Sequence, residues 1–262
     1  MALRRQSLVC ALACFCVVAS GTVQAVAGAW TKKTGEGEVI VSGLYAEASE
    51  SFGKSGDPSA IPVFRKADMQ ALAEYGLSDG VTVIGRAEWQ SVSSGRAPMF
   101  DEGRFGLVGF GLRARLYESR GAVVSAEAVG RVALEREEGG ETGDLDLRLA
   151  AGYGWSAGAY PAFVNAEAGF RRRFGDPADE IRVDLTVGVR PRPRLLLLAQ
   201  TFNAVVAGDA SGGAVEREHK LAVSAVYDVT SRLSVQVGGI ATVAGARTPR
   251  ERGLITAVWW RF

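Results

Sequence analysis

The sequence contains few residues of the types that carry most enzyme chemistry. Its 262 residues include three cysteines, Cys10, Cys14 and Cys16, and one histidine, His219. The cysteines all lie within the first 27 residues, which resemble a removable leader, so we expect no disulfide, zinc–cysteine site or cysteine nucleophile in the mature chain. No charge of one sign dominates either, because 30 Lys and Arg are matched by 29 Asp and Glu. This balance gives no support to a nucleic-acid partner.

Residues 1–27 have the pattern of a cleavable secretory signal, and 28–262 form the expected mature domain. Arg4 and Arg5 precede an apolar stretch over 8–20, and small residues at 23–25 or 25–27 provide a cleavage site. Two alternatives are a membrane anchor and a lipoprotein. The stretch is shorter than the roughly 18 to 20 residues that a membrane-spanning helix needs. Cys14 lies inside that stretch, with Ala11 rather than Leu three residues before it.

After the leader no apolar run is long enough to cross a bilayer as a helix, and the strongest, 195–199, is far too short. If embedded in a membrane, the chain must therefore form a closed barrel. Turn residues recur at near-regular intervals and divide the chain into twelve expected strands. These are 37–48, 62–76, 81–93, 103–117, 121–135, 143–155, 160–174, 179–190, 194–206, 216–228, 233–244 and 252–262.

Connections between the expected strands alternate in length. Short turns are expected at 76–80, 117–121, 156–159, 190–193 and 228–232, and longer polar loops at 49–60, 94–102, 136–142 and 208–215. Short turns at one rim and long loops at the other are typical of outer-membrane barrels. With an even strand number, both ends of the mature chain are expected on the periplasmic side. Tyrosines and tryptophans near strand ends further suggest aromatic girdles.

Alternation with a period of two separates apolar from charged side chains. In 143–155, Leu145, Leu147 and Leu149 lie on one face, and Asp144 and Asp146 lie on the other. The first and ninth strands are mixed, and their faces are not fixed by the pattern. We predict an all-β fold, an up-and-down antiparallel transmembrane β-barrel of about twelve strands.

The charged face is expected to line the lumen. Each Arg or Lys in contact with lipid near the bilayer midplane would cost about 2 to 4 kcal/mol, and a dozen would exceed the roughly 5 to 15 kcal/mol that keeps a protein folded. The predicted lumen-lining residues are Arg86, Glu88, Arg113, Arg115, Glu127, Arg131, Asp144, Asp146, Arg148, Glu167, Arg171, Arg182, Asp184 and Arg190. These charges form either a narrow channel or a closed lattice of ion pairs. Local arginine excess around 171–173 suggests a preference for anions, or contact with lipopolysaccharide phosphates.

The carboxyl end supplies a further signal. Residues 254–262 alternate and finish on Phe262 with no residue after it. This resembles the signature that the barrel-assembly machinery of bacterial outer membranes recognises. The expected partners are therefore that machinery, outer-membrane lipid and lipopolysaccharide.

Catalytic, metal and cofactor sites are not expected. A lipid hydrolase would need His219 beside a serine, but alternation places His219 with the lipid-facing residues and Ser224 on the opposite face. The acidic residues at 137–141 and 144–146 lack the spacing of a calcium loop. No phosphate-binding glycine pattern followed by a helix is present.

Two short stretches resemble known barrel groups. Residues 28–31, Gly-Ala-Trp-Thr, with Gly-Glu-Gly-Glu at 35–38, resemble small proteobacterial outer-membrane proteins that include the XagA-like group of surface-glycan loci. The turn at 74–79, Glu-Tyr-Gly-Leu-Ser-Asp, resembles one in barrel proteins of phenol-degradation pathways. The resemblance implies a surface-transport or glycan-related role and supplies no catalytic residues.

The expected function is a narrow passive channel in the outer membrane for a small hydrophilic solute or an exported glycan, and not an enzyme. The alternatives are a structural or adhesive barrel whose lumen is closed by ion pairs, and a lipid-modifying enzyme. A secreted β-sandwich is the alternative fold.

Overall fold

The computed structural model describes residues 28–95, 104–134, 141–175, 177–206 and 215–262. The predicted leader lies outside these residues, as do most of the loops predicted at 94–102, 136–142 and 208–215. The strands are β1 (Gly37–Phe52), β2 (Pro58–Ser78), β3 (Val81–Ser94), β4 (Arg104–Ser119), β5 (Ala122–Ala133), β6 (Glu141–Ala157), β7 (Tyr160–Gly175), β8 (Glu180–Arg192), β9 (Leu195–Val206), β10 (Glu216–Asp228), β11 (Leu233–Ala246), β12 (Thr248–Pro249) and β13 (Arg252–Arg261). None of the described residues forms a helix long and apolar enough to cross a bilayer.

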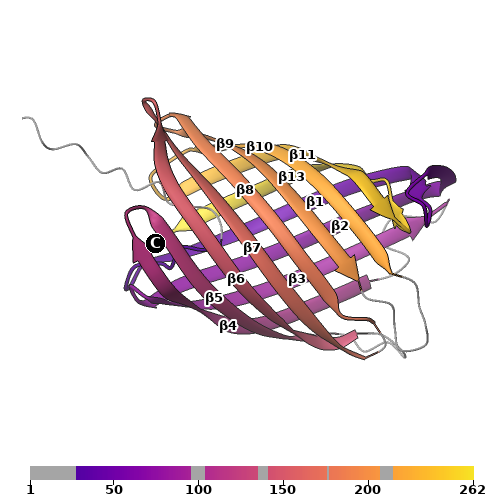
Figure 1. Ribbon diagram of the computed structural model, residues 1–262, viewed down its shortest axis with the longest axis horizontal. Coiled ribbons are helices and arrows are strands. Elements are labelled where there is room, and N and C mark those ends of the chain that lie inside the picture. Colours follow the sequence, from indigo (N-terminus) through magenta and orange to yellow (C-terminus); the bar gives the residue numbers. More distant parts are fainter. Residues whose placement is uncertain (1–27, 96–103, 135–140, 176, 207–214) are drawn as a thin grey trace, which may run out of the picture.

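The strands form one closed antiparallel sheet (Figure 1). Each long strand pairs with its neighbours in the sequence from β2 to β11, and β13 lies between β11 and β1. Pairing of β1 with β2 closes the sheet, with Val41 opposite both Ala71 and Val258. Apart from the two-residue β12, the long strands correspond to the twelve predicted segments. The predicted fold, an antiparallel β-barrel, is confirmed.

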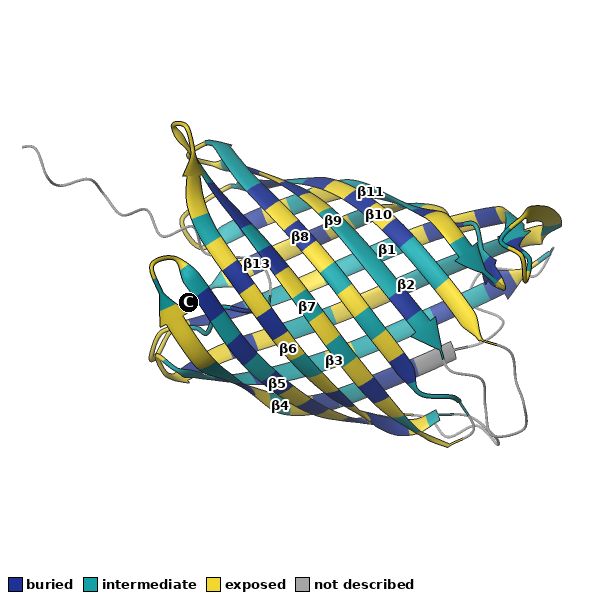
Figure 2. Ribbon diagram, viewed as in Figure 1, coloured by how far each residue is buried: buried dark blue, intermediate teal, exposed yellow. Residues whose placement is uncertain are grey.

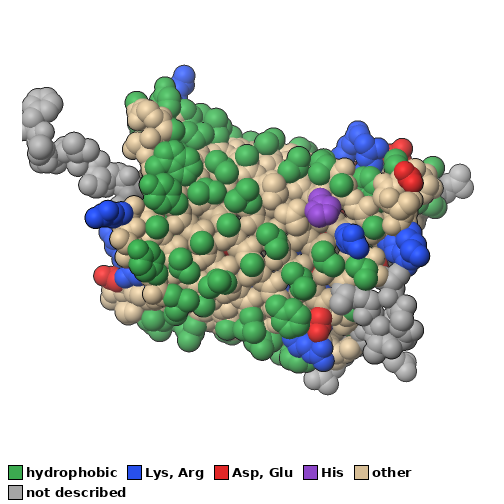
Figure 3. Space-filling view, in the orientation of Figure 1, with side chains coloured by type: hydrophobic (Ala, Val, Ile, Leu, Met, Phe, Trp, Pro, Cys, Tyr) green, Lys and Arg blue, Asp and Glu red, His purple; other side chains and the backbone are tan. Residues whose placement is uncertain are grey.

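Period-two alternation separates the two faces of the wall. Along β6, Asp144 and Asp146 are almost fully buried, whereas Leu145, Leu147 and Leu149 are exposed. Buried and exposed residues alternate along most strands (Figure 2). In the space-filling view, hydrophobic side chains are spread over the barrel wall, and most visible charged ones lie toward its two ends (Figure 3). This apolar exterior suits lipid tails, and the buried polar face points into the barrel.

One rim, which we call the turn end, holds the tight connections and Phe262. Two-residue turns occupy 79–80, 120–121, 158–159 and 193–194, and a four-residue connection occupies 229–232. At Arg120 and Gly121 the φ angles are 47° and 87°, which match the primed hairpin turn that the twist of two strands favours. Exposed Tyr and Trp side chains gather near this rim, namely Tyr75, Tyr117, Tyr153, Trp155, Tyr160, Tyr227 and Trp260. The described residues thus give this rim an aromatic girdle.

The opposite rim, the loop end, differs from prediction in one connection. The prediction of a loop over 49–60 is wrong, because β1 continues to Phe52 and β2 already begins at Pro58. Only 53–57 form the hairpin tip. Short β12 pairs with the other edge of β1, placing Thr248 opposite Phe52, and Phe52 is buried there. The extra strand satisfies backbone groups of β1 that a simple hairpin would leave open.

Candidate functional site in the barrel lumen

Strands β2 to β8 carry a continuous network of charged side chains on their inner face, which we call the charged wall. Arg86 on β3 donates to Glu127 on β5 at 2.5 Å, and Arg113 on β4 reaches Glu74 on β2 at 2.8 Å. Each contact passes over an intervening strand, as side chains on the concave side of a curved sheet can do. The predicted inward direction of these charges therefore agrees with their contacts.

Toward the loop end, the network is densest around Arg131. Its guanidinium binds both oxygens of Asp144, at 2.8 and 2.5 Å, and neither side chain is exposed. Glu88 lies 2.6 Å from the same guanidinium. Fork-to-fork pairs of this kind are directional as well as strong. They lock the side chains to the wall instead of leaving them free to meet a solute.

Midway along the lumen, Arg148 faces several carboxylates. Its Nε and Nη2 each lie 3.0 Å from Asp146, and its Nη1 lies 3.3 Å from Glu167 and 4.0 Å from Asp184. Arg171 also binds Asp146, at 3.0 Å. Cations and carboxylates thus alternate along this wall with few charges left to act alone.

The wall formed by β9, β10, β11, β13 and β1 has a different chemistry and is called here the neutral wall. One row in register consists of Leu198, Ser224, Gly238, Ile255 and Leu44, and the next of Gln200, Ala222, Ile240, Gly253 and Ala46. None of these residues is charged. The neutral wall is therefore uncharged in these two rows, whereas charged residues on its inner face form ion pairs on either side of them, Glu38 with Arg261 toward the turn end and Lys220 with Glu218 toward the loop end.

Residues 28–34, the amino-terminal segment, run inside the barrel and contact the charged wall. The carbonyl oxygen of Gly28 accepts a hydrogen bond from Ser125 at 3.1 Å, and the N–H of Ala29 donates to Asn165 at 3.2 Å. Arg113 donates to the carbonyl of Trp30 at 3.2 Å. Ala29, Ser125 and Asn165 are all at most 1% exposed. These bonds hold the segment across the lumen as separate attachments, without a strand ladder.

Trp30 is the largest side chain of the segment. Its ring meets Phe163 edge to face, with the centroids 6.0 Å apart. It also lies over Gly152, where a Cβ atom would fall 2.3 Å from the indole, so glycine makes room for it. Ile40 packs in the same cluster. The indole therefore lies inside the barrel, in the part of the lumen nearer the turn end, because Phe163 and Gly152 stand close to the ends of β7 and β6 at that rim.

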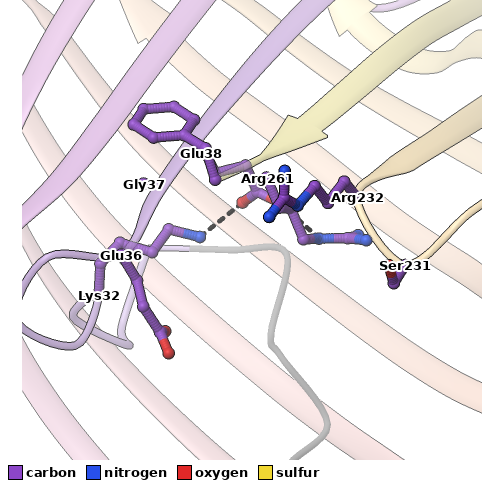
Figure 4. Close-up of a pocket in the computed structure, with 8 residues that line it drawn as sticks. Lys32, Glu36, Gly37, Glu38, Ser231, Arg232 and Arg261 are labelled. Carbon is purple, nitrogen blue, oxygen red and sulfur yellow. Dashed lines mark hydrogen bonds and ion pairs between the residues drawn. The ribbon is translucent and has the colours of Figure 1, made fainter.

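At the turn end the segment is anchored by charges and by one carboxylate in a turn. Lys32 lies 2.5 Å from Glu38, to which Arg261 donates at 3.0 Å (Figure 4). Lys32 also lies 3.4 Å from Glu74. A pocket of about 260 Å³ opens beside these groups. Asp79 accepts bonds from the backbone N–H and the hydroxyl of Thr34, at 3.0 and 2.8 Å. These two bonds lower the pKa of the Asp79 carboxyl from its usual value.

Most residues predicted to line the lumen lie in the charged wall. Those whose contacts join it are Arg86, Glu88, Arg113, Glu127, Arg131, Asp144, Asp146, Arg148, Glu167, Arg171, Arg182 and Asp184. Two others lie by the turns: Arg115 pairs with Glu118, and Arg190 with Asp228 at 2.6 Å.

The last residue, Phe262, is half exposed beside Trp260, and its backbone is hydrogen-bonded to the backbone of Gly37. Its role as an assembly signal stays a prediction.

Sequence reasoning missed the amino-terminal segment and Glu180. Glu180 binds Arg173 and Arg182 and is 2% exposed, but it stands at the first position of β8, where alternation is hard to assign. The isolated Trp30 in an otherwise polar stretch was the available signal for the segment.

His219, which the alternation of the sequence placed with the lipid-facing residues, has its Nδ1 2.9 Å from the Oδ1 of Asn203. Ser224 instead accepts a bond from Gln236.

Comparison with known proteins gives a structural likeness without a sequence family. No family model matches the chain, and no curated protein matches it by sequence. The COG4313 outer membrane channel from Pseudomonas putida F1 is similar in structure, with a TM-score of 0.64 and 15% identity over 89% of this chain and 97% of that one. The NanC porin has a TM-score of 0.51 and 10% identity, over 85% and 98%.

The fold is that of outer-membrane β-barrels. At these identities the likeness concerns the fold alone. An outer-membrane location follows from this fold together with the apolar exterior. The predicted likeness to XagA-like proteins has no support from a sequence family.

Proposed function

We propose that the protein is a narrow passive channel for small hydrophilic solutes, occluded toward its turn end by the amino-terminal segment. The observation that carries the proposal is the position of Trp30 inside the lumen, held by a few separate bonds. A barrel that served only as a scaffold could be closed by its wall charges alone. A segment attached in this way is able to leave without disrupting the strand pairing.

The division of the lumen supports a passage beside the neutral wall. Carboxylates hold the arginines of the opposite wall, and Leu44, Ile240 and Ile255 are half-buried residues without charge. Between the ion pairs of Arg261 and Lys220, a solute on this side would meet uncharged groups. Because an even number of long strands places both chain ends in the periplasm, we assign the turn end to the periplasm and the loop end to the cell surface.

Conductance of the purified protein in planar bilayers tests the proposal. We expect discrete steps smaller than those of a general porin measured in the same cell. If no steps occur where that porin conducts, the alternative of a structural or adhesive surface barrel with an ion-paired lumen replaces the channel. Liposome swelling with sugars of increasing size then separates a small solute from an exported glycan.

Ion selectivity tests the role given to the arginines. Arg131 and Arg148 are each bound to more than one carboxylate, so their fixed charge is largely cancelled at short range. We expect a reversal potential close to zero in a gradient of KCl. A potential near the chloride limit would instead support the anion preference suggested by the local arginine excess.

A further inference from the structure

Gly28 has an unusual neighbour inside the lumen. A Cβ atom built on Gly28 would lie 2.6 Å from both Cδ and Oε1 of Glu167, and 2.9 Å from Oε2. The carboxylate therefore packs directly on the α-carbon, and no larger residue fits without moving it. From bond lengths and angles, the main-chain nitrogen of Gly28 lies at most about 5 Å from Oε1.

Asn165 orients the Glu167 carboxylate and also holds the amino-terminal segment. Asn165 donates its amide Nδ2 to Oε1 of Glu167 at 2.9 Å, and its Oδ1 accepts the N–H of Ala29. Asn165 is 1% exposed. One buried amide thus aligns the carboxylate with the start of the segment.

Positive charge is scarce at this point. Among the residues that the structure describes, Arg148 is the cation in ion-pair contact with Glu167, and it also meets Asp146 and Asp184. The Nε and Nη2 of Arg148 are directed to Asp146, so Arg148 makes only one contact with Glu167, from Nη1 at 3.3 Å. A further cation next to Glu167 would therefore be stabilised by a carboxylate that is already oriented.

Cleavage of the leader creates such a cation. Ala25-Val26-Ala27 is a small-residue site of the kind that signal peptidases recognise. Hydrolysis adds water across the Ala27–Gly28 peptide bond, leaving a carboxylate on Ala27 and an amino group on Gly28 that is protonated at neutral pH. We propose that the chain is processed between Ala27 and Gly28, and that the new α-ammonium pairs with Glu167 and fastens the amino-terminal segment in the lumen.

The experiment uses a thiol reporter and does not depend on conduction, so it remains informative if the channel proposal fails. Ser125 is 1% exposed beneath Gly28, and Ser125→Cys places a nearly isosteric thiol there. The sequence has no other cysteine after Cys16. In this background, labelling by a water-soluble maleimide reports how often the segment leaves. Intact mass of the protein extracted from outer membranes gives its first residue.

The effect of Glu167→Gln on labelling is measured in two backgrounds. In one, Gly28 follows Ala27 directly; in the other, two serines inserted between Ala27 and Gly28 move the new amino group away from Glu167. With Gly28 first, we expect Glu167→Gln to speed labelling roughly tenfold, the scale of a lost charged hydrogen bond. In the inserted chain, labelling is already fast and Glu167→Gln adds little. Glu218→Gln removes an inner carboxylate whose partner Lys220 keeps Glu251 at 3.1 Å, and labelling should not change.

Two results would overturn the inference. One is a mature mass that begins at a residue other than Gly28, such as Val26. The other is an effect of Glu167→Gln that is equally large with and without the inserted serines, because the carboxylate would then act without the amino group.

Discussion

Replacing Trp30 by alanine is expected to release the amino-terminal segment from the lumen. A fully buried aromatic side chain removes about 150 to 250 Å² from water, which at about 25 cal/mol per Å² is roughly 4 to 6 kcal/mol. Trp30 is only partly buried against Phe163 and Ile40, so we expect a loss of about 2 to 3 kcal/mol. At about 1.4 kcal/mol for each factor of ten, the ratio of seated to displaced segment falls about 30- to 150-fold.

Single-channel recording measures this ratio as the fraction of time spent in the larger of two conductance states. Trp155→Ala is the matched control, because Trp155 lies on the exposed face beside Tyr153. Thermal unfolding of the barrel is expected to change little for Trp30→Ala, since the strand pairing does not include Trp30. Open fractions for Trp30→Ala and Trp155→Ala that both equal that of the parent protein would refute the role given to Trp30.

Three further predictions concern the wall, the anchor and the histidine. Arg131→Gln leaves buried Asp144 without its main partner and should lower the free energy of unfolding by about 3 to 5 kcal/mol, measured in urea; a change below 1 kcal/mol would contradict the assigned pairing. The pKa of Asp79 is lowered in the folded state, so its bonds to Thr34 hold above the ordinary pKa of 3.8 and weaken as pH falls below it. We therefore expect the open fraction in single-channel recordings to rise at low pH, and to rise less in Asp79→Asn. An identical rise in the two proteins would count against this anchor. His219→Ala should alter neither conductance nor phospholipid turnover, whereas loss of a lipid hydrolysis present in the parent would favour the enzyme alternative.

The barrel was predictable because a membrane imposes a simple rule on strands. On β6 the lipid must be met by Leu145, Leu147 and Leu149 and not by Asp144 or Asp146. A β-strand separates these two sets, because its successive side chains point to opposite faces. The turn residues then predicted where most strands begin and end at the rim that holds the short turns. The extension of β1 to Phe52 was not predictable, because it depends on β12, almost two hundred residues further along the chain.

The candidate site was predictable only in part for a similar reason. Alternation shows that Arg113 and Glu127 face inward, but the pairing of Arg113 with Glu74 depends on the curvature of the sheet. The amino-terminal segment has no alternation because it belongs to no strand. Its position depends on Asn165 and Ser125, two inner-wall residues distant in sequence.

In this account the amino-terminal segment, residues 28–34, occludes a channel whose wall remains intact without these residues. Deleting these residues leaves Glu38 with Arg261 and Glu74 with Arg113, so the barrel should still fold. In planar bilayers under one set of conditions, the deletion variant should show steps several times larger than those of the parent protein. Equal steps, or no conductance from a correctly folded deletion variant, would contradict the account.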